Sequence, residues 1–281
     1  MKKIVMTAII FCGLALTGCN GGNTDKGLPA TGGERHTAIP EETPISEAFN
    51  QKDQQIWYSL SPNDGTPGKD SIPTIYVFQD GNAQVYKSNG LTMSKITKMS
   101  DGEIIKNIKE SEKSELSDSI DKRIQELKQD KERDQKMSEP LLNSSQIDAA
   151  IAALEKARTT KLKVEPQPYT LNIETDSTGN RTERESLTFD TYFISLPDYS
   201  MNEIGDEYFS DTVELKEKDT ENLYFSSGYA KFEVCDQWFT GVYLTGLGKE
   251  GNYFVTRDPE KTGELSFILD QPGAKGVTID E

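Results

Sequence analysis

The chain has 281 residues, of which 34% are hydrophobic and 28% charged, and its formal net charge at pH 7 is −16. This length allows one large domain or two small ones. Because the negative charge repels nucleic-acid phosphates and anionic lipid headgroups, we exclude nucleic-acid binding and any polybasic contact with a membrane.

The first residues have the pattern of a secretory signal peptide. Lys2 and Lys3 precede an apolar run from Ile4 to Leu16, and small residues follow that run. No later apolar run approaches the roughly 18 residues that a membrane-spanning helix needs. We therefore expect residues 1–18 to be a signal peptide and the remainder of the chain to act outside the cytosol.

The apolar run ends in Leu16, Thr17, Gly18 and Cys19, and this ending resembles the lipobox of bacterial lipoproteins. The resemblance implies cleavage between Gly18 and Cys19 and attachment of a diacylglycerol to the Cys19 thiol. Because two acyl chains give stable anchoring, we expect Cys19 to hold the chain on the extracytoplasmic face of the cell membrane. The alternative is an ordinary cleaved signal peptide with a chance cysteine.

Residues 19–47 have the composition of a flexible tether, because their glycines and prolines leave little apolar area to bury. Within them, Leu28–Gly32 resembles the LPxTG pentapeptide of sortase substrates. Those substrates carry the pentapeptide near the C-terminus, before an apolar span and a basic tail, and neither follows it here. We interpret the match as accidental; cleavage after Thr31 would otherwise release the domain from its anchor.

Residues 48–97 are predicted to form a first β segment. Gln55–Leu60, Thr74–Phe78 and Ala83–Tyr86 are rich in β-formers, and Asp80-Gly81-Asn82 between the last two is a strong hairpin signal. The ligand spacing of an EF-hand is absent, so we interpret this Asp-Gly as a turn and not as part of a calcium loop.

Residues 98–160 are predicted to form a helical insertion. Ser100–Glu103 has the sequence of a capping box and Pro140 stops the pattern, which predicts a helix over residues 100–138, about 57 Å long at about 1.5 Å per residue. Its apolar residues share one side: Ile104, Ile105, Ile108, Leu116, Ile120, Leu127 and Met137. So narrow a stripe needs one docking partner, either a helix of this chain, which we favour, or another chain.

A second, shorter helix is the obvious partner for this stripe. Ser145–Asp148 has the sequence of another capping box, and the apolar residues on the following turns are Ile147, Ala150, Ile151 and Leu154. Pro166 and Pro168 end the helical insertion.

Residues 161–281 have a β pattern that contains a repeated aromatic doublet. Asp176–Asn180 and Gly248–Gly251 are hairpin-type breaks. The doublets recur every 14 to 16 residues: Tyr192-Phe193, Tyr208-Phe209, Tyr224-Phe225, Trp238-Phe239 and Tyr253-Phe254. Adjacent strand residues point to opposite faces, so a sheet built from such doublets must be covered on both faces. The alternatives are a simple preference of strands for aromatics and a partly exposed aromatic surface for a ligand.

Together these segments predict an α+β fold. We expect an antiparallel β-rich domain, either a sandwich or barrel-like, with the long helix and the shorter second helix inserted between its two β segments.

The sequence offers little of the usual catalytic equipment. The single histidine, His36, lies in the predicted tether, which excludes most Ser-His-Asp and Cys-His arrangements and His-based zinc sites. We therefore predict no catalytic residues, no metal and no cofactor. Cys12 leaves with the signal peptide and Cys19 carries the lipid, so the remaining Cys235 is expected to be a small buried strand residue, with a reactive thiol as the alternative.

Carboxylates are plentiful, and one stretch between residues 198 and 221 is rich in them. Its members are Asp198, Glu203, Asp206, Glu207, Asp211, Glu214, Glu217, Asp219 and Glu221. They could gather a calcium ion, but such a stretch is more often a solvated surface, which is the interpretation that we favour.

Several short segments resemble a set of small lipoproteins from low-GC Gram-positive bacteria. They are Ile56-Trp57-Tyr58, Tyr76–Gly81, Met99–Ile105, Phe267–Asp270 and Gly276–Asp280. The resemblance covers parts of both β segments and brings no particular activity with it. It does imply a place at the outer surface of the cytoplasmic membrane.

The leading functional hypothesis is a non-enzymatic binding or interaction module at the cell surface, with a protein, a peptide or an envelope component as its partner. One alternative is a carboxylate-dependent hydrolase that acts on cell-wall glycan. Another is a pheromone precursor, because cleaved lipoprotein signals such as Phe11–Gly18 resemble peptide pheromone precursors of Gram-positive bacteria.

Overall fold

The computed structural model describes residues 42–280, except residues 63–64, 139–141, 161–163, 198, 202–206, 210–211, 247–248 and 250. The predicted signal peptide and residues 19–41 of the predicted tether therefore lie outside the described part. Within it, the structure confirms a mixed fold in which helices accompany a large, mainly antiparallel sheet.

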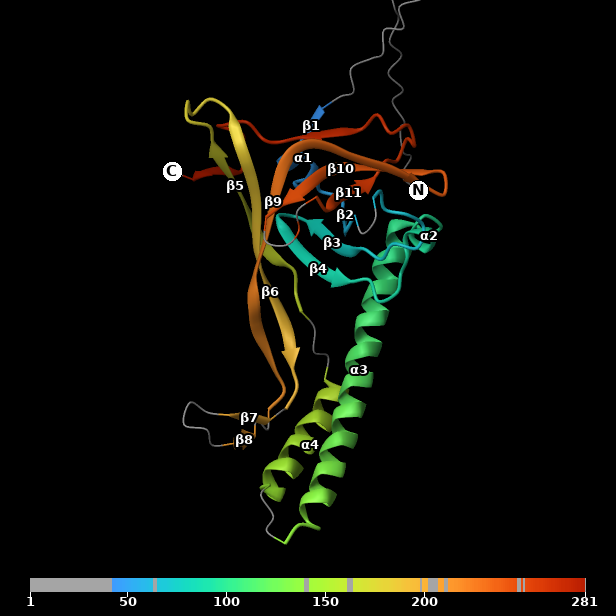
Figure 1. The fold of residues 1–281 in the computed structure, drawn as a ribbon, viewed down its shortest axis with the longest axis vertical. Helices are drawn as coiled ribbons and strands as arrows, with labels where there is room; N and C mark the ends of the chain where they lie inside the picture. Colours follow the sequence, from blue (N-terminus) through green and yellow to red (C-terminus); the bar gives the residue numbers. More distant parts are fainter. Residues whose placement is uncertain are drawn as a thin grey trace, which may run out of the picture. The chain divides into compact units, whose positions relative to one another are not determined.

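The main sheet closes on itself. Its nine strands lie in the order β13-β5-β4-β3-β2-β11-β10-β9-β6, and an additional pairing of β5 with β6 joins all of them except β13 into a ring (Figure 1). The ring strands are β2 (Gln55–Leu60), β3 (Thr74–Gln79), β4 (Asn82–Lys87), β5 (Gln167–Thr175), β6 (Thr182–Ser195), β9 (Glu214–Val234), β10 (Gln237–Thr245) and β11 (Tyr253–Arg257). Of the two predicted architectures, the pairing is therefore barrel-like and not a sandwich.

The remaining strands lie beside the ring. β13 (Val277–Asp280) pairs in parallel with β5. β1 (Glu42–Pro44) pairs in parallel with β12 (Ser266–Ile268), and β7 (Tyr199–Met201) pairs antiparallel with β8 (Glu207–Phe209).

A short helix, α1 (Ile45–Phe49), lies inside the ring and forms the centre of its core. The Phe49 ring contacts aromatic rings from five strands, with centroid distances of 4.3 Å to Phe78, 5.1 Å to Trp57, 6.1 Å to Phe225, 6.2 Å to Phe254 and 6.3 Å to Tyr169. Every ring strand contributes to this core, whose buried members include Tyr76, Ala83, Leu171, Leu187, Phe189, Leu223, Val242 and Leu244. The structure therefore differs from the predicted tether, residues 19–47, because Ile45 and Ser46 are buried here.

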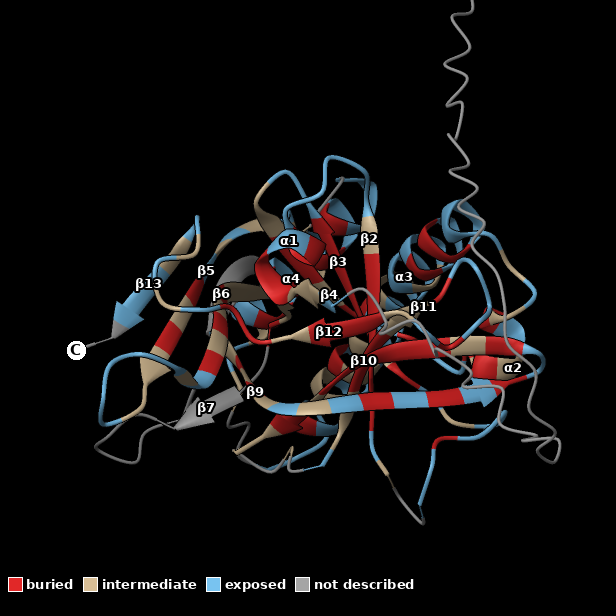
Figure 2. Cartoon of the chain, turned by 90° about the horizontal axis from the view of Figure 1, so that it is seen from above, coloured by how far each residue is buried: buried red, intermediate tan, exposed pale blue. Residues whose placement is uncertain are grey.

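The outer face of the ring is also covered. Helix α2 (Met93–Ile96) and the first turns of α3 (Asp101–Asp134) pack against it. The buried residues on this side include Ile56, Tyr58, Ile75, Tyr86, Phe232, Phe239, Val255, Met93, Ile96, Ile104 and Ile108. Strands buried along most of their length are visible in Figure 2. The expectation of a sheet covered on both faces is thus confirmed for these strands.

The aromatic doublets contribute unequally to the two cores. Phe225 and Phe254 lie inside the ring and Phe239 lies outside it, all of them buried. Their partners Tyr224, Trp238 and Tyr253 are only half-buried. Each described doublet therefore supplies one core residue and one residue near the surface.

The tight turns follow the sequence signals closely. Asp80 and Gly81 connect β3 to β4 with φ values of 51° and 74°, as a two-residue hairpin requires. Gly179, with φ 71°, lies in the predicted break between β5 and β6. The predicted break at Gly248–Gly251 lies partly outside the described residues.

The long helix α3 begins where it was expected and ends earlier. Ser100 N donates to Glu103 Oε2 at 2.7 Å and Glu103 N donates to Ser100 Oγ at 3.4 Å, so the capping box is confirmed. The helix ends at Asp134, whose buried carboxylate accepts a hydrogen bond from Leu142 N, 3.1 Å away, on the returning chain. Met137 is therefore not part of the helical stripe, and its side chain is 49% exposed.

Helix α4 (Ser144–Thr159) folds back on α3, as predicted. Lys131 pairs with Asp148 and Arg158 pairs with Asp121, a register that only antiparallel helices allow. The buried residues between the two helices are Ile120, Ile124, Leu127, Ile147, Ala150, Leu154 and Ala157.

The cap of α4 corrects the sequence prediction. Asn143 and not Ser145 is the N-cap: its Oδ1 accepts hydrogen bonds from Ser145 N at 3.1 Å and from Gln146 N at 3.4 Å. The predicted box at Ser145–Asp148 begins two residues too late, inside the helix.

Replacing Asn143 with alanine should therefore lower the free energy of unfolding by about 1 kcal/mol, the usual cost of losing an N-cap side chain. Replacing Ser145 should have a smaller effect, because its hydroxyl donates to Asn143 Oδ1 at 2.6 Å but caps no backbone N–H of the helix. Urea unfolding of the two variants measures the difference. A larger loss in Ser145→Ala than in Asn143→Ala would contradict this assignment.

Candidate binding cavity at the rim of the ring

A cavity of about 320 Å³ lies at the rim of the ring, where β2 begins and β11 ends. Its walls come from the α1 region, the first residues of β2, the end of β11, the start of α3 and the β12 segment. The lining residues are Thr43, Ala48, Gln51, Gln55, Ile56, Trp57, Tyr58, Asp101, Thr256, Arg257, Pro259, Leu265 and Phe267.

The pairing of β2 with β11 positions the central part of this wall. Trp57 is opposite Thr256 and Tyr58 is opposite Val255, and Thr256 Oγ1 donates to Ile56 O at 2.8 Å. Because successive strand residues point to opposite faces, Trp57 belongs to the core inside the ring and Tyr58 to the core outside it. The cavity therefore reaches residues from both sides of β2.

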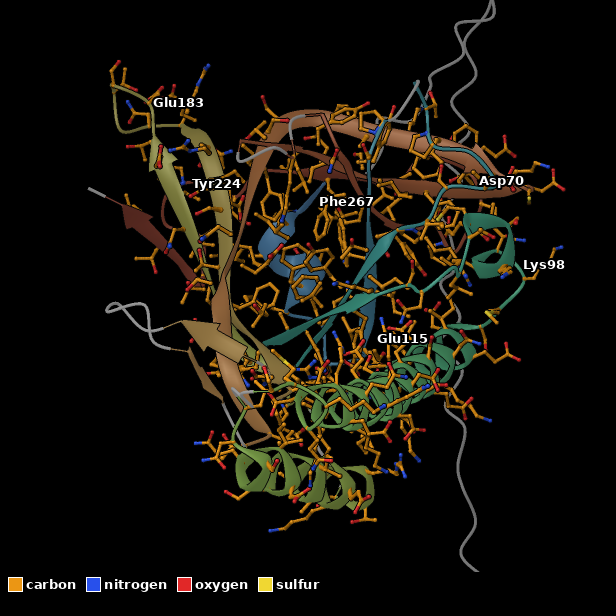
Figure 3. The ribbon with its side chains drawn as sticks, turned by 60° about the horizontal axis from the view of Figure 1, so that its bottom comes forward. Asp70, Lys98, Glu115, Glu183, Tyr224 and Phe267 are labelled. Atoms are coloured by element: carbon orange, nitrogen blue, oxygen red, sulfur yellow. The ribbon has the colours of Figure 1, made fainter. Side chains whose placement is uncertain are left out.

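The part of the wall that faces α1 is apolar and aromatic. Trp57 packs edge-on against Phe267, with their ring centroids 4.9 Å apart, and stacks on Phe254 at 5.1 Å. Phe267 lies close to α1 among the side chains inside the ring (Figure 3). Leu265 and Ala48 extend this apolar surface.

The opposite part of the wall carries a fixed charge pair. Arg257 Nη1 donates to Met99 O at 3.0 Å and Arg257 Nη2 donates to Ile96 O at 2.8 Å, so the guanidinium joins the end of β11 to the chain between α2 and α3. The same Nη1 lies 3.5 Å from Asp101 Oδ1, in the first turn of α3. Arg257 thus holds α3 at the cavity and neutralises Asp101.

Three buried donors of the lining residues have no hydrogen-bond partner: Trp57 Nε1, Tyr58 Oη and Arg257 Nε. Burial raises the pKa of the Tyr58 phenol above its ordinary range, and the charges of Arg257 and Asp101 act on it in opposite directions. Tyr58 therefore stays protonated at neutral pH. Each buried donor without a partner costs about 1–3 kcal/mol, and none of these three atoms is exposed to the cavity.

Two buried carboxyl groups meet elsewhere, inside the ring. Asp270 N donates to Glu185 Oε2 at 2.8 Å, and the Asp270 carboxylate accepts hydrogen bonds from Ser46 N at 2.7 Å and Ser46 Oγ at 2.5 Å. Burial raises the pKa of Glu185 to about 9, so this carboxyl is neutral at pH 7. Neither acid lines the rim cavity; instead, Asp270 holds the first turn of α1 and Glu185 holds Asp270.

The residues of the predicted lipid site, Leu16, Thr17, Gly18 and Cys19, lie outside the described part of the chain, as do Leu28–Gly32 and His36. Of the acidic stretch from 198 to 221, Glu221 has a described side chain. It accepts hydrogen bonds from Tyr76 Oη at 2.8 Å and from Lys249 Nζ at 2.5 Å. Across the described residues, no three or more His, Cys, Asp or Glu side chains group as metal ligands would.

The prediction for Cys235 is wrong. Its thiol is free and exposed, and with Asp236 it forms the two-residue turn between β9 and β10, at φ values of 50° and 59°. The alternating pattern placed Cys235 in a strand, but β9 ends at Val234.

The rim cavity had no counterpart among the sequence predictions. Ile56-Trp57-Tyr58 was predicted only as part of a strand and of a resemblance, and Arg257 carried no signal. In the part of the chain that the structure describes, none of the helices has the length and apolar character needed to cross a membrane.

Comparisons with protein-family models, with curated proteins and with solved structures found no match.

Proposed function

We propose that the chain is a lipid-anchored binding protein on the extracytoplasmic face of the cell membrane, and that it takes a small ligand in the rim cavity. The cavity supports the binding part of this proposal, because it combines an apolar wall with a charged pair, Arg257 and Asp101. Ligand sites have this mixed character, and the cavity volume of about 320 Å³ is near the lower end of their range.

The anchoring part is supported by the sequence. Leu16–Cys19 follows a charged and then apolar N-terminus, as a lipobox does. Residues 20–41 separate Cys19 from β1, which begins at Glu42.

The anchor is tested by feeding labelled palmitate to cells that express the wild-type chain or Cys19→Ala. The label should appear on the wild-type protein and not on the variant, and protease added to intact cells should digest the folded part. An unlabelled wild-type protein would overturn the anchoring part of the proposal.

The binding part is tested by heating the purified chain with a panel of small metabolites. A ligand that binds the folded state raises the melting temperature. The rise should be lost in Leu265→Trp, which fills the cavity, and kept in Ile72→Trp, because Ile72 is 59% exposed and does not line the cavity. A stabilising ligand that works equally well on both variants would count against this site.

The hydrolase and pheromone alternatives stay predictions. A hydrolase of cell-wall glycan needs two carboxyl groups at a substrate cleft. Glu185 and Asp270 are close together, but their hydrogen bonds hold α1 and they do not line the rim cavity.

A further inference from the structure

The ring of strands has one short junction, between β4 and β5, which we call the β4–β5 seam. The two strands pair only at Asn82–Pro168 and Ala83–Gln167. Among the described residues, every other pair of neighbouring ring strands is matched over four residues or more. Because backbone hydrogen bonds hold neighbouring strands together, the ring should open first at this seam.

A few further hydrogen bonds hold the two sides of the seam. Gln84 Nε2 donates to Val164 O at 3.0 Å, and Tyr86 Oη donates to Gln84 Oε1 at 2.6 Å. Tyr169 N donates to Gly81 O at 3.3 Å. These bonds join β4 and the turn before it to the start of β5, but they do not extend the strand pairing.

The helical insertion is attached to both sides of this seam. It leaves the ring after β4 and returns to it at the start of β5 (Figure 1). Helix α3 is fixed to the β4 side, because Ile104 and Ile108 lie in the same buried cluster as Tyr86 of β4. Helix α4 precedes β5 in the chain and so belongs to the other side. Contact between α3 and α4 therefore connects the two sides of the seam outside the ring.

That contact is extensive and includes the end of β6. Leu154 of α4 is completely buried against α3, in the cluster that contains Ile120. Arg123 Nε of α3 donates to Pro197 O, just after β6, at 2.7 Å, and Leu196 packs on the same cluster. Because β6 is the other neighbour of β5, the two helices hold β5 both through α4 and through β6.

The seam leads to the aromatic core inside the ring. Tyr169, at the start of β5, packs edge-on against Phe78 at 5.7 Å and Phe49 at 6.3 Å between ring centroids. Its Oη donates to Asn50 Oδ1, just after α1, at 2.8 Å. If β5 moves away from β4, Tyr169 leaves Phe78 and exposes the side of this core.

We propose that the α3–α4 hairpin is a clamp on the β4–β5 seam, and that loosening the contact between the two helices opens the ring there. In this motion β5 and its partners β6 and β13 separate from β4, while β2, β3, β10 and β11 stay paired. The clamp gives the long helix a role, since a partner that binds the hairpin controls access to the interior of the ring. The inference does not depend on a ligand in the rim cavity.

Hydrogen exchange of the purified full chain, followed by mass spectrometry, tests the clamp with Leu154→Ala. We expect exchange in peptides that cover residues 82–87 and 167–170 to become at least about tenfold faster than in the wild type. Peptides from β10 should change by less than about threefold, because the rest of the ring stays paired.

The matched control is Leu244→Ala, which makes the same change at a leucine that is also completely buried. Leu244 lies on β10 inside the ring and does not contact the hairpin cluster. This variant should speed exchange in β10 at least as much as at the seam. A milder variant, Arg158→Gln, removes the half-exposed ion pair with Asp121 between α4 and α3. It should fold and should speed exchange at the seam by about threefold, again with β10 little changed.

Two results would overturn the proposal. Faster exchange confined to α3 and α4 in Leu154→Ala, with the seam unchanged, would mean that the hairpin loosens without opening the ring. An equal rise at the seam and in β10 would mean that the hairpin stabilises the whole fold and not this seam. If Leu154→Ala does not fold, the same two comparisons in Arg158→Gln decide the matter.

Discussion

Replacing Phe49 with alanine is expected to lower the free energy of unfolding by about 3–5 kcal/mol, the range for removing a buried phenylalanine. The reason is its position: Phe49 is completely buried on α1 and contacts aromatic rings from β2, β3, β5, β9 and β11. Because α1 lies inside a closed ring, the strands cannot collapse far into the space that the missing ring leaves.

Urea unfolding followed by tryptophan fluorescence measures this loss, and Ile72→Ala provides the control. Like Phe49, Ile72 is a large apolar residue, but it is 59% exposed. Its replacement should therefore change the free energy of unfolding by less than about 0.5 kcal/mol. If Phe49→Ala costs no more than Ile72→Ala, α1 is not the centre of the core.

The features that the sequence predicted correctly are those decided by residues close together in the chain. Asp80-Gly81 forms the β3–β4 turn because a two-residue hairpin needs positive φ, which these residue types tolerate. Ser100 and Glu103 start α3 because their side chains reach each other's backbone N–H groups. Both signals extend over at most four residues.

The features that the sequence missed depend on distant contacts. α3 ends at Asp134, and the Asp134 carboxylate accepts a hydrogen bond from Leu142 N on the returning chain. The ring closes because β5 returns to β4 across the whole helical insertion, at the pairs Asn82–Pro168 and Ala83–Gln167. No periodicity in either strand indicates which partner it will take.

The rim cavity was missed for the same reason. Trp57 and Arg257 come together only because β2 pairs with β11, roughly 200 residues later in the chain. Asp101 reaches them because α3 starts beside the end of β11. Trp and Tyr in a strand pattern predict core residues, which these are, and their unpartnered donors become apparent only once the neighbours are known.

The carboxyl pair inside the ring should make stability depend on pH in an unusual direction. Glu185 is 0% exposed and Asp270 1% exposed, and burial raises the pKa of Glu185 from about 4.5 to about 9. Between these two values the folded chain keeps a proton that the unfolded chain has lost. Stability from this group is therefore fully present below about pH 4.5 and falls as the pH rises, by about 1.4 kcal/mol per unit.

The variant Glu185→Gln isolates this effect, because glutamine keeps the shape and does not titrate. The free energy of unfolding of the wild type minus that of the variant should fall by about 3 kcal/mol between pH 5 and pH 7, measured by urea unfolding in matched buffers. Glu183→Gln is the matched control: Glu183 lies two residues away on β6, is exposed at the end of the strand (Figure 3), and should give no such slope. A wild-type-minus-Glu185→Gln difference that stays constant from pH 5 to pH 8 would mean that Glu185 is ionised inside the ring. The Asp270 backbone N–H, which donates to Glu185 Oε2 at 2.8 Å, would then stabilise a carboxylate and not a neutral carboxyl.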